Sequence, residues 1–427
     1  MLLPVTYRVN ERGRADVGGC DLVALAQEFG TPLYVYDEAT VRDSCRAYVA
    51  AMAGRGEVMY SAKAFASPGF LRVVASEGLG LDVVSEGELH LALASGYPTD
   101  RIHFLGNNKS LADVAAAAAA GATLVIDGFR DLDLIAEVVP RGGRLRCEVR
   151  VAPGVQAATH DFIATGHADS KFGFPIASGE ARSAVERALG SDRVDLRGLH
   201  SHIGSQITNL GGHLAAMVSV LDLAQELHRD LGWSADWLSA GGGLGIAYAA
   251  ADDPPTPNEF VEALLAGLVQ GCADRDLAVP RLVVEPGRSI AGPAGVALYS
   301  VGSIKDAPGG RRFVAVDGGM GDNIRPGLYG ARYEVLAAGA PEAAAQQRVT
   351  VVGKYCESTD VLVEEARLPA VAAGDVLCLP AAGAYCLSMA SQYNGIPRPA
   401  VVMVSDGQAR PLRRRETLDD LLLAEVF

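Results

Sequence analysis

The feature of this sequence that most constrains its fold is an alternation of two textures between residues 31 and 293. Short runs rich in apolar and β-branched residues end in polar or glycine-containing turns, and alanine- and leucine-rich stretches of helical character separate them. Each unit spans about 25–40 residues, a rhythm that predicts alternating strands and helices in a parallel α/β architecture. The expected strands are 33–37, 57–64, 80–85, 102–109, 123–128, 146–153, 196–205, 237–245 and 281–288.

The ends of these runs carry residue types that are able to do chemistry. They are Lys63, Asp82, Asn107, Arg150, His202, the glycines at 241–243 and Glu285. In a (β/α)8 TIM barrel the carboxyl ends of all strands converge on one mouth, whereas an open Rossmann-like sheet concentrates its site at one switch point. Polar ends on so many strands favour the barrel, which we predict over residues 31–293.

After residue 293 the pattern changes to β-rich runs joined by loops, with few long helical stretches before residues 418–427. This region, 294–427, predicts an all-β domain of Greek-key or sandwich-like type. Residues 1–30 are too few for a domain of their own, and we expect them to add a strand to the β domain. A chain of 427 residues is long enough for two such domains.

Charge and cysteine content limit the partners and the location. The net charge of −14 argues against non-specific binding to nucleic acid, although an acidic protein can still hold a local anion site. The longest apolar stretch, 114–126, is shorter than the ~20 residues of a membrane helix, so we expect a helix that runs into a strand. The seven cysteines show no metal-type spacing, and the amino terminus has no apolar signal core, which together predict a cytoplasmic protein without a disulfide framework or bound metal.

Lys63 closes an apolar run, which is an unusual place for a charge. Taken alone, a lysine that extends its ammonium to solvent at a strand end is the ordinary interpretation. The alternative is a Schiff-base lysine, because partial burial depresses the pKa of an amine and makes it nucleophilic.

Glycines and histidines form the second candidate group. Three consecutive glycines at 241–243 leave backbone N–H groups unshielded and could wrap a phosphate, although a tight structural turn explains them equally well. His200 and His202 lie two residues apart and therefore on one strand face. One of these rings could stack on an aromatic cofactor while Ser205 helps to hold a phosphate; a metal site lacks a third ligand of suitable spacing.

Glu285 ends the last barrel-like run, within the sequence EPGR at 285–288. A buried glutamate is costly unless it has a cationic or hydrogen-bonding partner. A protonated pyridine nitrogen would be such a partner, and a simple ion pair with Arg288 is the alternative. A lysine, a histidine platform, a glycine cradle and a glutamate for a ring nitrogen are together what pyridoxal phosphate (PLP) needs.

At this point the sequence resembles the alanine-racemase-like, fold-type III family of PLP enzymes and, within it, the diaminopimelate decarboxylases. The resemblance covers essentially the whole chain, and several of its motifs are long. They include YSAKA, LDVVSEGEL, FLGNNKS, GLHSHIGSQI, VVEPGRSIAG, VDGGMGDNIRP, CESTD and GAYC.

The resemblance implies a set of site residues. The implied cofactor-binding residues are Lys63, Asp82, Arg150, His202, Ser205, Gly242, Gly243, Glu285, Gly287, Arg288 and Tyr385. The implied substrate-binding residues are Arg288, Arg325, Tyr329, Glu357 and Tyr385, and the implied catalytic residues are Lys63, His202 and Cys356. In this assignment Lys63 forms the Schiff base, His202 stacks on the ring and Glu285 faces the ring nitrogen. Cys356 returns a proton to the substrate, and Glu357 binds the distal amine of the substrate.

The resemblance also implies an activity, a partner and a pathway position. The expected reaction is the carboxy-lyase conversion of meso-2,6-diaminopimelate to L-lysine and carbon dioxide, the last step of lysine biosynthesis. Cys356 and Glu357 are expected to enter the site of a second subunit, which predicts a homodimer with shared active sites.

Alternative functions on the same fold stay open. One is a related decarboxylase acting on another basic amino acid or on a carrier-bound glutamyl group; those for simple diamines should lack the arginines for a distal carboxylate. Another is a non-enzymatic PLP-binding barrel protein, which should lack the β domain. A third is a phosphate-dependent barrel enzyme without PLP, which should lack the visible absorbance of a Schiff base.

Overall fold

The computed structural model describes residues 2–155 and 170–426. The chain forms two compact units: unit 1 comprises residues 1–43, 246–253 and 290–427, and unit 2 comprises residues 44–245 and 254–289. The domain limits predicted from the sequence, 31–293 for the barrel and 1–30 with 294–427 for the β domain, remain a prediction.

Unit 2 is a closed barrel of eight parallel strands, as the sequence predicted. Its strands, in their order around the barrel, are β5 (Gly56–Ser61), β6 (Gly80–Val83), β7 (Ile102–Phe104), β8 (Thr123–Ile126), β9 (Leu145–Ala152), β11 (Val194–His200), β12 (Trp237–Ser239) and β13 (Arg281–Val284). Pairing of β13 with β5 closes the ring, and the two-residue strand β10 (Phe174–Pro175) pairs with β9 outside it.

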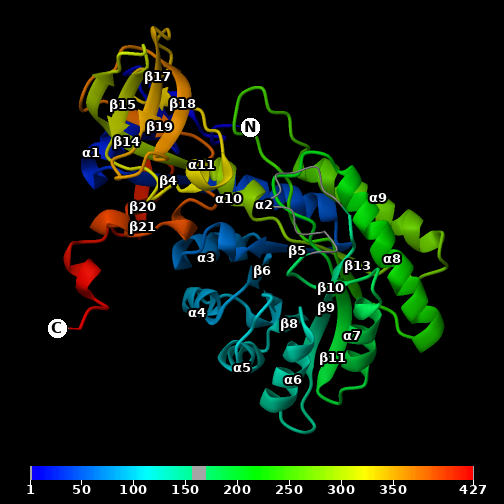
Figure 1. The fold of residues 1–427 in the computed structure, drawn as a ribbon. Coiled ribbons are helices and arrows are strands. Elements are labelled where there is room, and N and C mark those ends of the chain that lie inside the picture. Colours follow the sequence, from blue (N-terminus) through cyan, green and yellow to red (C-terminus); the bar gives the residue numbers. More distant parts are fainter. Residues whose placement is uncertain (1, 156–169, 427) are drawn as a thin grey trace. The chain divides into compact units, whose positions relative to one another are not determined.

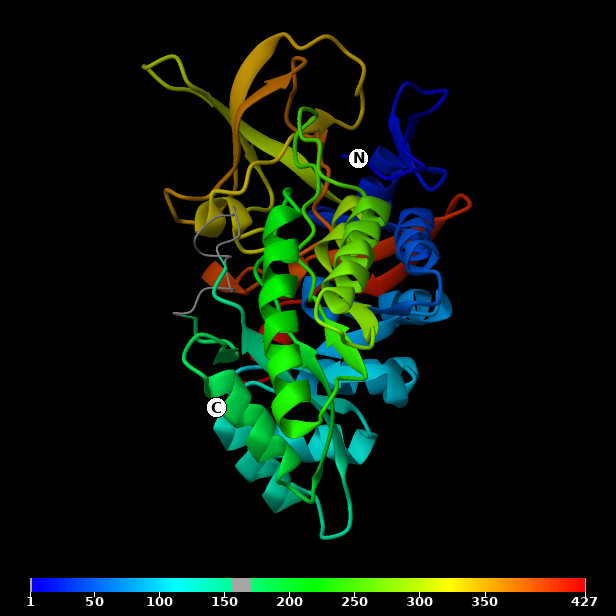
Figure 2. The ribbon, with the colours of Figure 1, turned by 90° about the vertical axis from the view of Figure 1, so that its right-hand side faces the viewer.

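Helices surround these strands (Figure 1). They are α2 (Glu38–Met52), which precedes β5, and then α3 (Pro68–Ser76), α4 (Glu86–Ser95), α5 (Leu111–Ala120), α6 (Phe129–Val138), α7 (Glu180–Leu189), α8 (Gly211–Leu231) and α9 (Pro257–Ala273). The long helices α8 and α9 lie side by side on the barrel (Figure 2).

Local sequence explains where the short barrel helices begin and end. Ser110 caps α5 by accepting a hydrogen bond from the Asp113 amide, and the Asp113 carboxylate accepts one from the Ser110 amide. The helix ends at Gly121, whose left-handed backbone conformation costs little without a side chain. Strand β8 begins two residues later at Thr123, so the apolar stretch 114–126 is a helix that runs into a strand, as predicted.

The barrel interior holds polar groups in addition to apolar ones. Glu148 of β9 is fully buried; it accepts a hydrogen bond from the indole of Trp237 and lies 3.1 Å from the Nδ1 atom of His103. These three residues come from strands that do not neighbour one another, so their contacts cross the interior. Gly198 makes room for this group, because a Cβ atom there would lie 2.5 Å from the Trp237 ring.

Unit 1 is built around a mixed sheet in which the long strand β14 (Gly295–Asp306) is central. The strand order is β18 (Val361–Leu368), β17 (Gln347–Val352), β15 (Arg312–Val316), β14, β4 (Leu33–Asp37), β20 (Ala400–Ser405) and β21 (Gln408–Arg413). Strand β19 (Val376–Leu379) also pairs with β14, and β16 (Leu336–Ala337) pairs with β19. The run 33–37, which the sequence analysis grouped with the barrel strands, therefore lies in this sheet.

The first thirty residues do not join the large sheet directly. They form a separate three-stranded antiparallel sheet of β1 (Arg8–Val9), β2 (Ala15–Val17) and β3 (Cys20–Asp21), followed by helix α1 (Leu22–Phe29). Apolar side chains of β2 and α1 share one buried cluster with side chains of β4, β14 and β20. Unit 1 also contains the short helices α10 (Arg288–Ala294), most of which lies in this unit, and α11 (Arg325–Tyr329).

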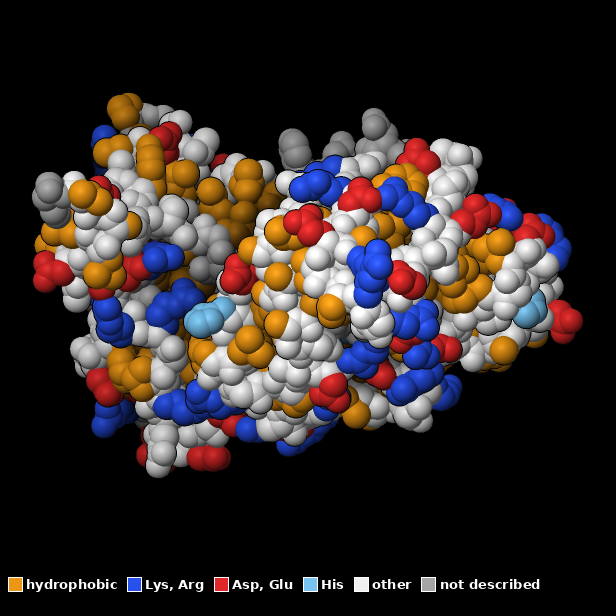
Figure 3. All heavy atoms as spheres, turned by 90° about the horizontal axis from the view of Figure 1, so that it is seen from below, with side chains coloured by type: hydrophobic (Ala, Val, Ile, Leu, Met, Phe, Trp, Pro, Cys, Tyr) orange, Lys and Arg blue, Asp and Glu red, His pale blue; other side chains and the backbone are white. Residues whose placement is uncertain are grey.

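Two surface properties bear on possible partners. On the face drawn in Figure 3, lysine and arginine side chains lie interspersed with aspartate and glutamate side chains. Within the described residues, no helix combines the length and the apolar character needed to cross a membrane.

The close approach of Gly198 to Trp237 gives the first prediction. Gly198→Ala is expected to lower the free energy of unfolding by about 1–3 kcal/mol, because the added methyl group would overlap the half-buried Trp237 indole. Chemical denaturation followed by circular dichroism measures this loss. Gly87→Ala is the control, since Gly87 is exposed in helix α4 of the same unit and has room for a Cβ atom. Equal stability of the two variants would contradict the packing argument.

Candidate active site

Lys63 lies at the mouth of the barrel, in a single turn (Ala62–Ala64) that directly follows β5. The Schiff-base interpretation predicted partial burial of Lys63, but its side chain is exposed. Its charge acts on neighbouring groups: burial and the charge of Glu285 raise the pKa of Asp82 well above its usual range, and the Lys63 ammonium partly opposes that rise. Both carboxyl oxygens of Asp82 are buried and have no hydrogen-bond partner among the described residues. Asp82 therefore favours its neutral form.

His202, the predicted ring platform, follows β11 and is half-buried. Its Nδ1 atom accepts a hydrogen bond of 3.2 Å from the Gly242 amide, which leaves the proton of the neutral ring on Nε2. Burial, together with the charges of Lys63 and Arg150, lowers the pKa of His202 well below its usual range. The ring is thus neutral and held in one orientation.

The three glycines connect the loops that follow β11, β12 and β13. A Cβ atom at Gly242 would lie 2.1 Å from the Glu285 carbonyl oxygen, and one at Gly243 would lie 2.3 Å from the Gly204 carbonyl oxygen. The Gly243 carbonyl also accepts a hydrogen bond from the Ile207 amide. The glycine run therefore serves as a close-packed turn, one of its two predicted interpretations, and the phosphate cradle remains a prediction.

Glu285 directly follows β13 and is almost completely buried. The Nε2 atom of His200 lies 3.0 Å from its carboxylate, and the Ser239 hydroxyl donates a hydrogen bond of 2.5 Å to it. Burial alone would raise the pKa of Glu285, but His200 and Ser239 hold it at about 2. Arg288, the alternative partner predicted for Glu285, donates to the Ser205 hydroxyl at 2.8 Å.

Arg150 and Gly287 complete the predicted cofactor residues of unit 2. Arg150 is buried, donates to the Asp127 carboxylate at 3.2 Å and lies over the Phe172 ring. Gly287 is packed so closely that a Cβ atom would lie 3.0 Å from Ser61. The structure thus places the residues predicted in unit 2 near the carboxyl ends of barrel strands or in the segments that directly follow them.

The predicted substrate residues of unit 1 include Arg325, which is buried at the start of α11. Its guanidinium lies 4.8 Å from the Tyr248 ring centre and 5.5 Å from the Tyr333 ring centre, and it donates to the Tyr333 hydroxyl. The rings of Tyr248 and Tyr333 therefore fix the orientation of the Arg325 guanidinium. The sequence predicted Arg325 as a site residue but did not predict these two contacts.

Cys356 and Glu357 are both exposed on the loop after β17. The Cys356 amide donates to the Asn394 side chain at 3.0 Å, and the Tyr393 hydroxyl donates to the Glu357 carboxylate. Buried Asp360 closes this loop by accepting hydrogen bonds from the Met320 and Tyr355 amides. The loop is thus a braced structure that presents a thiol and a carboxylate to its surroundings.

Tyr329 and Tyr385 are half-buried in unit 1. Tyr385 has a backbone φ of +61°, a conformation that bulky residues rarely adopt. Strain of this kind persists where the surrounding structure imposes it and is concentrated at functional positions.

Several functional candidates were missed by the sequence analysis. His200 was weighed only as one member of a histidine pair, and Ser239, Asp127, Tyr333 and Asp360 were not considered. His200 and Ser239 could have been found from their positions, since each is the last residue of a barrel strand.

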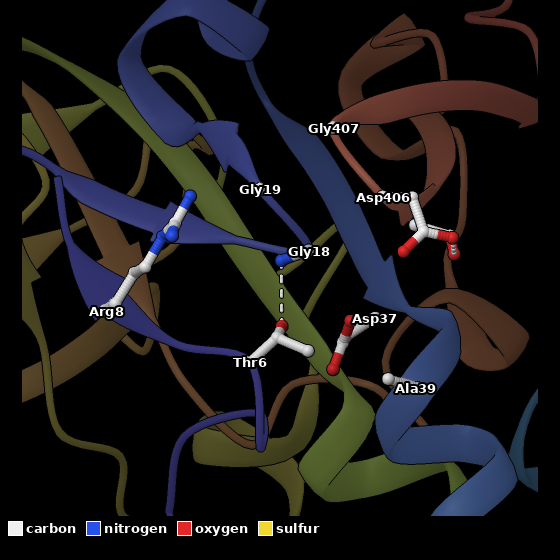
Figure 4. A pocket seen from close by; sticks show the side chains of 9 residues that line it. Thr6, Arg8, Gly18, Gly19, Asp37, Ala39, Asp406 and Gly407 are labelled. Carbon is white, nitrogen blue, oxygen red and sulfur yellow. Dashed lines mark hydrogen bonds between the residues drawn. The ribbon is translucent and has the colours of Figure 1, made fainter.

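A pocket of about 500 Å³ in unit 1 contains none of the predicted site residues (Figure 4). It is lined by Thr6, Arg8, Gly18, Gly19, Asp37, Ala39, Ser405, Asp406 and Gly407. Its central polar groups make local contacts: Asp37 accepts hydrogen bonds from Thr40 at the start of α2, and Thr6 accepts one from the Gly18 amide. Throughout residues 2–155 and 170–426, no group of three or more His, Cys, Asp or Glu side chains could hold a metal ion.

Comparison with known proteins identifies the family. Residues 38–292 match the model of the pyridoxal-dependent decarboxylases, in its pyridoxal-binding domain. The chain is 42% identical over 431 residues to diaminopimelate decarboxylase of Bacillus subtilis, covering 100% of this chain and 98% of the relative. It is 44% identical over 428 residues to the Mycobacterium leprae enzyme of the same name, covering 98% and 91% respectively.

Solved structures agree with these matches. The crystal structure of diaminopimelate decarboxylase from M. jannaschii in co-complex with L-lysine superposes with a TM-score of 0.93 at 34% identity, covering 100% of this chain and 99% of that one. The chain is therefore a pyridoxal-dependent decarboxylase of fold-type III. Within that class it belongs to the diaminopimelate decarboxylase family.

Proposed function

We propose that this protein removes carbon dioxide from meso-2,6-diaminopimelate to give L-lysine, the last step of lysine biosynthesis, with PLP as its cofactor. The observation that carries the proposal is the full-length match to diaminopimelate decarboxylases in both units of the chain. A solved relative at 34% identity is in complex with L-lysine, which is the proposed product here.

The residues of unit 2 fit PLP. A flat aromatic ring needs a platform, and the neutral, oriented His202 imidazole supplies one. A protonated ring nitrogen needs an anion, and buried Glu285 is held ionised. A phosphate needs accessible backbone N–H groups, and Gly243 is the partly exposed residue of the 241–243 turn. The aldehyde needs an accessible amine, and the Lys63 side chain is exposed.

The cofactor, when bound, supplies an electron-accepting ring that stabilises the negative charge left at the substrate Cα by the departure of carbon dioxide. The protein supplies binding, orientation and proton transfer. We assign Lys63 to covalent attachment and amine exchange, and Cys356 to return of the proton to Cα. Asp82 and Arg150 are assigned to the polar surroundings of Lys63, and Ser205, Gly243, Gly287 and Tyr385 would hold the phosphate.

Selection of the correct substrate requires recognition of its second end. Diaminopimelate carries an amine and a carboxylate at both ends, so the protein must bind the distal pair. Arg288, Arg325 and Tyr329 are assigned to carboxylate binding, since a guanidinium grips a carboxylate through two parallel hydrogen bonds. Glu357 is assigned to the distal amine.

We also propose a homodimer with shared active sites and a cytoplasmic location. The exposed, braced loop with Cys356 and Glu357 supports a contribution to a second subunit. All seven cysteines lie within the described residues and none is in a disulfide, which suits a reducing compartment.

Lys63→Ala is expected to lower kcat by more than about a hundredfold, because both covalent attachment and proton transfer by the amine are lost. Mass spectrometry after borohydride reduction should show cofactor attached to the wild-type chain and absent from the variant. Lys305→Ala, at an exposed position of β14, is the control and should keep both properties. Retention of more than a few per cent of activity by Lys63→Ala would contradict the assignment.

Arg325→Ala is expected to lower kcat/KM for diaminopimelate, because the buried contact between the guanidinium and the substrate carboxylate is lost. The loss should correspond to about 2–5 kcal/mol of transition-state stabilisation. Cofactor absorbance should be unchanged. A panel of ornithine, lysine and arginine assayed for carbon dioxide release tests the substrate at the same time. Unchanged kinetics in Arg325→Ala, or faster release from another amino acid, would show that the carboxylate assignment is wrong.

Complementation tests the shared site. Lys63→Ala chains and Cys356→Ala chains, each inactive alone, are mixed under conditions that exchange subunits. In a two-fold dimer each mixed pair has one site with both changes and one intact site, so activity should rise to roughly a quarter of wild type. If native mass spectrometry confirms mixed dimers and activity does not rise, each site is built within a single chain.

A further inference from the structure

His200 is a buried titratable residue to which the proposed reaction assigns no role. It is the last residue of β11, has no exposed surface and projects its Nε2 atom to within 3.0 Å of the Glu285 carboxylate. Because an ionised carboxylate can only accept hydrogen bonds, Nε2 carries the proton in this contact. His200 therefore donates to the residue that faces the cofactor ring in the proposed function.

A second hydrogen-bond donor to Glu285 comes from β12, the strand that lies between β11 and β13. The Ser239 hydroxyl at the end of β12 donates to Glu285, and the Gly241 amide in turn donates to Ser239 at 3.1 Å. Glu285 is thus fixed by the terminal residues of two adjacent strands. This arrangement allows little reorientation of the carboxylate.

Asp82 is a second buried carboxyl group that could be ionised in place of Glu285. Asp82 and Glu285 are both buried in the same interior, and each disfavours ionisation of the other. Their pKa values separate in opposite directions: that of Glu285 falls to about 2, while that of Asp82 rises well above its usual range. The difference between their surroundings is the pair of donors, because only Glu285 receives hydrogen bonds from described side chains.

We propose that His200 is a positioning residue that keeps Glu285, rather than Asp82, as the ionised and oriented acceptor for the protonated ring nitrogen of PLP. The inference rests on the proposed function, since it requires PLP in the barrel. His200 acts through Glu285 and takes no part in the bond changes at the substrate. Its loss affects the cofactor first, and substrate recognition at the distal end is unaffected.

The test compares two polar replacements of similar chemistry. His200→Gln places an amide donor near the position of Nε2, whereas the shorter side chain of His200→Asn does not reach Glu285. His200→Asn should weaken PLP affinity and lower kcat by about 10–100-fold, the range seen when a group that orients a site is removed. His200→Gln should stay within about threefold of wild type in both, and KM for diaminopimelate should be similar in all three proteins.

Cofactor binding is measured separately from activity, by titrating the apoenzyme with PLP and recording the visible absorbance of the bound cofactor. His103→Asn is the matched control, because His103 lies 3.1 Å from buried Glu148 in the same barrel. It should lower stability without changing PLP affinity or the spectrum. Loss of PLP affinity in His103→Asn equal to that in His200→Asn would overturn the proposal, because the effect would then be general to buried histidine–carboxylate pairs.

A double-variant cycle distinguishes positioning from a general structural effect. In a Glu285→Gln background, His200→Asn should cause no further loss of PLP affinity or kcat if His200 acts through Glu285. Additive losses, or wild-type behaviour of the single His200→Asn variant, would overturn the proposal. Failure of the proposed function has a separate signature, since the wild-type protein would then bind no PLP or release no carbon dioxide from diaminopimelate.

Discussion

Burial of charge inside a closed barrel is the constraint on which the site depends. A carboxylate removed from water is strongly destabilising unless donors replace the lost hydration. Glu285 meets this requirement through the His200 ring and the Ser239 hydroxyl, both at the carboxyl ends of neighbouring strands. The closed parallel sheet makes the arrangement possible, because adjacent strand ends in a barrel are held in fixed register at one mouth.

The turns at the mouth of the barrel are also closely packed. Gly242 and Gly243 lie so close to neighbouring carbonyl groups that any side chain would separate the loops. Their packing brings the Gly242 amide to the His202 ring and fixes its tautomer. The glycine run forms a close-packed turn, and its second interpretation, as a phosphate cradle, remains a prediction.

The barrel could be predicted from the sequence because polar strand ends recur with the spacing of β/α units. The family could be predicted because long motifs cover both units. It misassigned the run 33–37, whose apolar character suits either sheet and whose place in unit 1 depends on pairing with β14 and β20, far away in the chain. The supports of the site were also missed. The ring contact of Tyr248 with Arg325 joins residues separated by several elements, and that of Tyr333 depends on how the chain turns back after α11, so no local pattern indicates them.

Three buried carboxyl groups in the barrel, Glu148, Glu285 and Asp82, differ in their hydrogen-bond partners. Glu148 contacts Trp237 and His103 through one oxygen and has no hydrogen-bond partner for the other among the described residues, and Glu285 receives hydrogen bonds from Ser239 and His200. Asp82 has no hydrogen-bond partner for either oxygen among the described residues. A buried polar group without a partner is expensive, and it persists where another group completes it. Asp82 lies close enough to Lys63 and Glu285 for their charges to shift its pKa. The unsatisfied carboxyl therefore marks the part of the interior that a bound ligand has to complete, in agreement with its assignment to the cofactor.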